Sequence, residues 1–136
     1  MRVACALVCL GVLACACTTE PKTCAMPASL AGETLLPAEI DDILKRRCRM
    51  CHSDPTRMFA PMPLVTWEDV QALRSQNTGE FVFEAIGRRI HDEKFPMPPL
   101  PAPSLSDEQK AAWPKLTREE IDTLDAWIAD CAPSAD

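Results

Sequence analysis

Two cysteines and a histidine stand close together in the chain as Cys48, Cys51 and His52. They form the C-x-x-C-H pattern through which proteins attach haem c covalently. Each thiol can add to one vinyl group of the porphyrin, and the imidazole that follows can bind the iron. A thioredoxin-like redox pair would need a βαβ setting, and a zinc site would need two further ligands at metal spacing. The sequence has neither, so it predicts one covalent haem c with His52 as an axial ligand.

The ligand on the other face of the iron decides what such a haem does. A methionine sulfur gives a six-coordinate iron suited to electron transfer, whereas an open position permits small-molecule chemistry. Met97 lies in a proline-stiffened loop, and two predicted helices separate it from His52, which leaves enough chain to wrap around the porphyrin. We therefore predict Met97 as the distal ligand. The alternatives are Met62 and Met58, which follow the motif closely, and His91, the only other histidine.

The N-terminus has the pattern of an export signal. Met1 and Arg2 precede an apolar run over 3–14, which is too short to span a bilayer but long enough for a signal peptide. Cys15 follows small residues and resembles the lipidated cysteine of a bacterial lipoprotein. Cys17 is the rival lipidation site, and ordinary cleavage after Ala16 is a third possibility. We expect a signal peptide over 1–14, with its boundary between 14 and 16, and a lipid-anchored protein of the periplasm or cell envelope.

The remaining sequence divides into a tether over 15–36 and a single haem domain over 37–133. Cys24 and Cys131 flank that domain, and an oxidising compartment favours a disulfide between them. Two free, partly buried thiols are the alternative. The 136 residues suffice for one small domain. The net charge of −6 makes nucleic acid an improbable partner and favours docking to a basic redox protein.

Apolar periodicity and capping patterns predict helices and no strand, which indicates an all-α domain. The second helix should continue past Leu73 to a break at 77–79, and the last should bury Leu124 and Trp127. The predicted helices are one from Pro37 into the haem motif, one opened by Thr66, one over 80–90, one over 106–113, and one opened by Thr117.

These motifs together resemble the small monohaem c-type cytochrome domains of the class I fold, of the type common in planctomycete and myxobacterial secreted proteins. The resemblance is carried by the haem motif after an Ile/Leu helix, by Arg89-Ile90, by Met97-Pro98-Pro99 and by the final Ile121 to Ile128 segment. It covers about 37–133. It implies a small helical domain wrapped around one covalent haem, with Met97 as the distal ligand and the last helix crossing the first.

The chain departs from this family pattern at two places. The stretch from Pro101 to Lys115 is additional, and the usual Gly-Pro after the haem motif is missing. We expect Pro61 or Pro63 to supply the backbone carbonyl that orients His52 through its Nδ1–H.

Three further side chains are candidates for contact with the haem propionates. Arg88 and Arg89 could each pair with a propionate, although a solvated helix face suits at least one of them. Trp67 is expected to pack in the core rather than to reach a propionate.

The expected function is that of an electron carrier rather than an enzyme, with iron cycling between Fe(II) and Fe(III) and redox proteins as partners. Two other functions remain open at the level of sequence. One is a haem enzyme or sensor, such as a peroxidase, whose distal ligand is absent or exchangeable. The other is a haem subunit of a larger oxidoreductase, so the sequence allows a monomer or a subunit of a redox complex.

Overall fold

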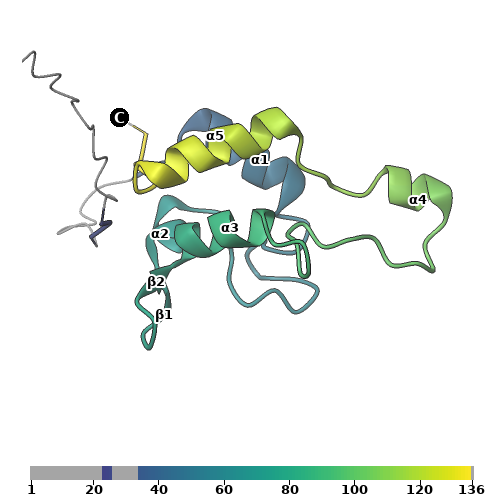
Figure 1. The fold of residues 1–136 in the computed structure, drawn as a ribbon, viewed down its shortest axis with the longest axis horizontal. Coiled ribbons are helices and arrows are strands. Elements are labelled where there is room, and N and C mark those ends of the chain that lie inside the picture. The colour runs from purple at the N-terminus through teal and green to yellow at the C-terminus, as the bar shows by residue number, and fades with distance from the viewer. Residues whose placement is uncertain (1–22, 26–33, 136) are drawn as a thin grey trace, which may run out of the picture.

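The computed structural model describes residues 23–25 and 34–135 of the chain. The expected signal peptide and both candidate lipidation sites, Cys15 and Cys17, lie outside these residues. In the part described, no helix is both long and apolar enough to cross a bilayer. The elements follow one another as α1 (Ala38–Arg47), α2 (Trp67–Gln71), β1 (Leu73–Ser75), β2 (Glu80–Phe81), α3 (Val82–Ile90), α4 (Asp107–Ala111) and α5 (Arg118–Ala129) (Figure 1).

Four helices build the core that positions the site. The last helix, α5, packs against both α1 and α3, and α2 packs against α3. A Cβ atom at Gly87 would lie only 3.3 Å from the Ile128 side chain, so glycine allows α3 to approach α5 this closely. Each of these helices contributes one side chain that is completely or almost completely buried. These side chains are Leu44, Val70, Phe83 and Leu124.

Side-chain caps explain where most of the helices begin. Thr66, Ser106 and Thr117 each accept a hydrogen bond from the backbone at the third helical position, whose own side chain bonds back to the cap. Such reciprocal boxes satisfy amide groups that the first helical turn leaves unpaired. Pro37 precedes the first residue of α1. The prediction of a mainly helical domain is therefore confirmed.

The prediction that the chain has no strand is wrong. After α2 ends at Gln71, β1 pairs with β2 in an antiparallel hairpin, and α3 begins at Val82 rather than at Glu80. Leu73, which was expected on the inner face of a longer helix, lies in β1 and is 40% exposed.

The hairpin replaces the end of the expected helix because pairing across the turn satisfies the backbone. Gly79 takes a positive φ of 66°, which glycine adopts at no steric cost, and its amide donates to the Ser75 carbonyl. Arg74 on β1 also forms an ion pair with Glu80 on β2, at 2.8 Å. The segment over 72–76 contains good helix formers, but so short a stretch gains little helical stability without tertiary packing.

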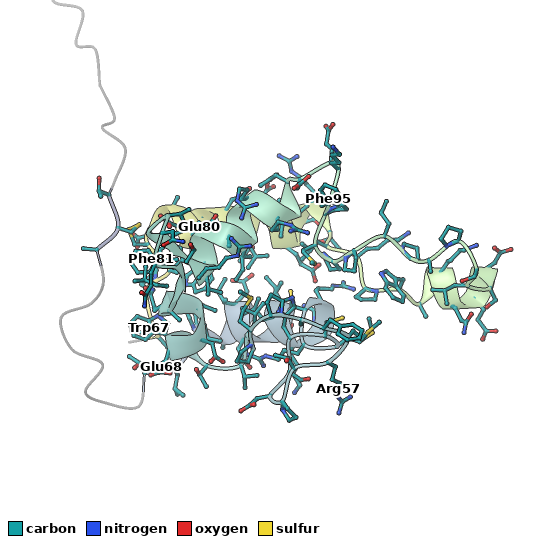
Figure 2. All side chains as sticks on the ribbon, turned by 90° about the horizontal axis from the view of Figure 1, so that it is seen from below. Arg57, Trp67, Glu68, Glu80, Phe81 and Phe95 are labelled. Carbon is teal, nitrogen blue, oxygen red and sulfur yellow. A yellow bond between two sulfur atoms is a disulfide. The ribbon has the colours of Figure 1, made fainter. Side chains whose placement is uncertain are left out.

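A disulfide joins Cys24 to Cys131 just beyond α5, across a sequence separation of 107 residues. A cross-link closing so long a loop is worth on the order of 4 kcal/mol in the chain-entropy description. Trp67 lies buried close by, and its indole N–H donates to the Ala132 carbonyl at 2.9 Å. Trp67 is a core residue, because it is buried within the main hydrophobic cluster. Figure 2 shows it at the other end of the body from Arg57 and Phe95.

The additional stretch forms an arm over 100–115 that projects away from the packed helices (Figure 1). It carries α4, none of whose residues is buried. At the base of the arm, the chain returns through Trp113 and Pro114 to the loop that contains Met97.

Candidate haem site

A cavity of about 250 Å³ lies between the end of α1, the loop that follows it, α3 and the loop after α3. Cys48, Cys51, His52 and Met97 all line it, although Met97 comes from a different part of the chain than the other three. From α3 the cavity receives the apolar side chains of Val82, Ala85, Ile86 and Ile90, together with Arg89. The fold thus gathers the two thiols, the His52 imidazole and the Met97 thioether around a single apolar space.

The rim of this cavity exposes large apolar side chains. Met50, Met58 and Phe59 line the cavity and are exposed, Phe59 completely so at 106%. Met58 and Phe59 also adopt positive φ angles of 50° and 61°, which are uncommon for non-glycine residues. Contiguous exposed apolar side chains mark binding sites. The rim therefore fits a large, flat, apolar ligand that would cover it.

The His52 ring is oriented by the loop that follows the motif. Its Nδ1 lies 2.8 Å from the Met62 carbonyl oxygen, and the Leu64 amide donates to the His52 carbonyl at 2.9 Å. A carbonyl only accepts, so Nδ1 carries the proton and Nε2 is the nitrogen that can bind a metal. The expectation that Pro61 or Pro63 provides this carbonyl is wrong, because the residue between them does so.

Arg49, inside the motif, holds the same loop in place. Its guanidinium donates to the carbonyls of Leu64 and Val65 at 2.7 and 3.0 Å and pairs with Asp41 at 2.6 Å. Charge-assisted bonds of this kind are about twice as strong as neutral ones. Sequence reasoning missed Arg49 because the variable positions of C-x-x-C-H give no signal about their partners.

The rival axial ligands occupy other positions. Nε2 of His91 lies 2.9 Å from the Asp125 carboxylate on the surface, and His91 does not line the cavity. Met58 and Met62 do line it, but they belong to the loop next to the motif, and the Met58 sulfur lies 3.5 Å from Cys51 Sγ. Among the cavity-lining methionines, only Met97 comes from outside the segment around the motif.

Every charged side chain in the cavity wall is an arginine: Arg47, Arg74 and Arg89. Nε of Arg89 is buried and has no hydrogen-bond partner among the described residues, whereas Arg88 points away and pairs with Glu80 at 2.9 Å. A buried donor without a partner is costly, so it indicates an acceptor that the protein atoms do not supply. The wall thus fits a ligand with an apolar body and anionic groups, as haem is.

The thiols are poorly placed for disulfide exchange. Cys48 caps the C-terminal end of α1, where the helix dipole disfavours a thiolate. Burial also raises the pKa of the Cys48 thiol to about 12, whereas reactive cysteines have lowered values. Within 23–25 and 34–135, no three His, Cys, Asp or Glu side chains gather as a metal cluster. The position of Cys48 therefore does not favour a reactive redox pair.

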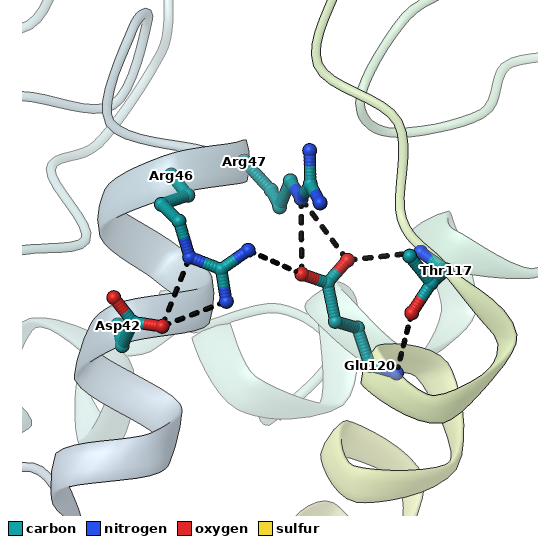
Figure 3. Close-up of polar contacts among 5 residues, drawn as sticks. All are labelled: Asp42, Arg46, Arg47, Thr117 and Glu120. Carbon is teal, nitrogen blue, oxygen red and sulfur yellow. Dashed lines mark hydrogen bonds and ion pairs between the residues drawn. The ribbon is translucent and has the colours of Figure 1, made fainter.

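A buried carboxylate ties the last helix to the end of α1, directly before the haem motif (Figure 3). Glu120 is 9% exposed and accepts hydrogen bonds from Arg46 at 2.7 Å, from Arg47 at 3.0 Å and from the Thr117 amide at 2.9 Å. Burial alone would raise the pKa of Glu120, but these donors outweigh it and lower the pKa below 4.5. The sequence revealed the Thr117 cap but not the two arginines.

The variant Glu120→Gln is expected to lower the free energy of unfolding by about 1.5–3 kcal/mol, because it removes a charged acceptor from three donors. The deficit should be complete above pH 4.5, the ordinary pKa of the group, and should shrink as pH falls toward the lowered folded-state pKa. Denaturant titrations of both proteins at several pH values measure it. Asp42→Asn, which removes only the exposed partner of Arg46, is the matched control and should change stability little. A deficit that stayed constant down to acid pH would contradict this account.

Comparisons with protein-family models, with curated proteins and with solved structures found no match.

Proposed function

We propose that this protein is an exported monohaem c-type cytochrome, with a cytochrome c-like fold, that transfers single electrons. One observation carries the proposal: both thiols of the C-x-x-C-H motif, His52 and the distant Met97 converge on one apolar cavity. Local sequence places the first three together. Met97 reaches the same cavity from a distant part of the chain, which supports it as the second axial ligand.

Haem c, when bound, supplies an iron that takes up or releases one electron. The chain's own residues would hold and tune it. Cys48 and Cys51 provide the sulfur atoms for the thioether links, and the Met62 carbonyl keeps Nε2 of His52 available as a ligand. Met97 supplies a second, uncharged ligand, which limits the change in coordination between the oxidation states.

The remaining walls suit the same cofactor. The apolar face of α3 would exclude water from the porphyrin, and the unpartnered Nε of Arg89 would be suited to a propionate. The exposed rim formed by Met50, Met58 and Phe59 would leave an edge of the cofactor close to an approaching redox protein.

Export and anchoring belong to the same proposal. Covalent haem attachment and the Cys24–Cys131 disulfide both suit an oxidising compartment outside the cytoplasm. The N-terminal signal pattern supports delivery there, with Cys15 or Cys17 as the site of a lipid anchor on the cell envelope.

The intact mass of the mature protein, expressed with haem-attachment machinery, tests the proposal. We expect the mass of one haem and a disulfide, which is seen as two missing hydrogens. The same measurement shows whether a lipid is present. A mature chain without added haem would refute the proposal, and carbon monoxide binding to the reduced protein would indicate an open distal site instead.

A further inference from the structure

We propose that Trp113, at the base of the arm, is a positioning residue for Met97. Its indole hydrogen bond holds the Met97 loop against the cavity and so determines how readily the methionine leaves the iron. This inference rests on the proposed function and adds to it a determinant of ligand exchange.

The Met97 loop is held on both sides of the methionine. Before it, the Met97 amide donates to the Arg89 carbonyl at the end of α3, at 2.9 Å. After it, the indole N–H of Trp113 donates to the Pro99 carbonyl at 2.6 Å, and Pro114 joins the cavity wall. Met97 therefore lies between one anchor on the helical body and one on the arm.

The second anchor acts through a stiff connection. Pro98 and Pro99 have restricted φ angles, so fixing the Pro99 carbonyl restricts the backbone of Met97 two residues earlier. A thioether is uncharged and a weak electron donor, and an exogenous ligand in solution competes with it. A loop that is already ordered loses less entropy when its sulfur binds the iron.

The arm contacts the Met97 loop at its base, through Trp113, and not through α4 at its tip. No residue of α4 is buried, and α4 lies away from the packed helices (Figure 1). Trp113 is half-buried, and its hydrogen bond reaches the residue that ends the Met-Pro-Pro segment. The part of the chain that departs from the family pattern thus supplies a hydrogen bond to the loop that carries the predicted distal ligand.

Trp127 offers a matched control, because its indole also donates to a proline carbonyl, that of Pro133, at 2.9 Å. Trp127 does not line the cavity. Trp113→Phe and Trp127→Phe therefore delete the same kind of hydrogen bond at two different places.

The experiment titrates imidazole into the oxidised haem-containing proteins and follows the loss of the weak red absorption band of methionine-ligated haem. Trp113→Phe is expected to bind imidazole about three to ten times more tightly than the wild type, as the loss of one hydrogen bond predicts. Trp127→Phe should match the wild type. Hydrogen exchange of the Met97 amide should also become faster only in Trp113→Phe. Trp113→Leu is a second variant with the same expectation.

Equal imidazole affinity in the wild type and in both Trp113 variants, with the methionine band present, would overturn the role of Trp113 and leave the proposed function intact. An equal gain in Trp127→Phe would also overturn it, because the effect would then be a general loss of stability. A wild type that carries no haem, or that lacks the methionine band, would refute the proposed cofactor or ligand and this inference with it.

Discussion

Replacing Met97 by alanine is expected to abolish the weak red absorption band of the oxidised protein and to lower its reduction potential. The drop should be on the order of 0.2 V, within the range of about 0.8 V over which axial ligands set haem potentials. The reduced variant should also bind carbon monoxide, because a position on the iron becomes open. Optical spectroscopy and a potentiometric titration measure these effects.

Met62→Ala is the matched control for this experiment. Met62 lines the same cavity, but it acts on His52 through its backbone carbonyl, which alanine retains. We expect the band and the potential to survive this change. If Met97→Ala left both unchanged while Met62→Ala removed the band, the two methionines would have to exchange roles.

Replacing both Cys48 and Cys51 by alanine is expected to eliminate covalent haem. Without the two sulfur atoms no thioether can form, and His52 with Met97 would hold the cofactor only by bonds that acid breaks. After acid denaturation and solvent extraction, the variant should retain almost no haem, whereas the wild type should retain all of it. Haem staining of a denaturing gel and intact mass give the two values.

Cys24 and Cys131 provide the control for cysteine loss in general. They form the disulfide just beyond α5 and do not line the cavity. Replacing both by serine should leave the haem covalently attached while lowering stability. Haem that stayed bound to the Cys48/Cys51 variant through denaturation would contradict the attachment site.

The secondary structure was predictable wherever a local signal existed. Thr66, Ser106 and Thr117 signalled helix starts correctly, because a capping box is complete within four residues. The hairpin of β1 and β2 was missed, since its stability comes from cross-strand pairing and from ion pairs to Glu80 rather than from alternation in two very short strands.

The types of residue that line the candidate site were predictable, but the contacts that hold those residues in place were not. No short-range pattern distinguishes Arg89, whose Nε is buried beside the cavity, from Arg88, which pairs with Glu80 on the surface. The sequence likewise carried no signal that Glu120 would accept bonds from the end of α1, or that Trp113 would reach Pro99. These contacts join segments that are far apart in the sequence, and the packing of the helices decides whether they meet in space.

By itself, the sequence determined the C-x-x-C-H motif, because Cys48, Cys51 and His52 are neighbours in the chain. It also determined most helix starts, which short-range hydrogen bonds control. Only the tertiary structure decided that Met97 enters the cavity wall while His91 pairs with Asp125 on the surface. The position of a residue that is distant in sequence depends on the closure of the loops and on the packing of α1, α3 and α5 against one another. No local sequence pattern specifies these long-range contacts.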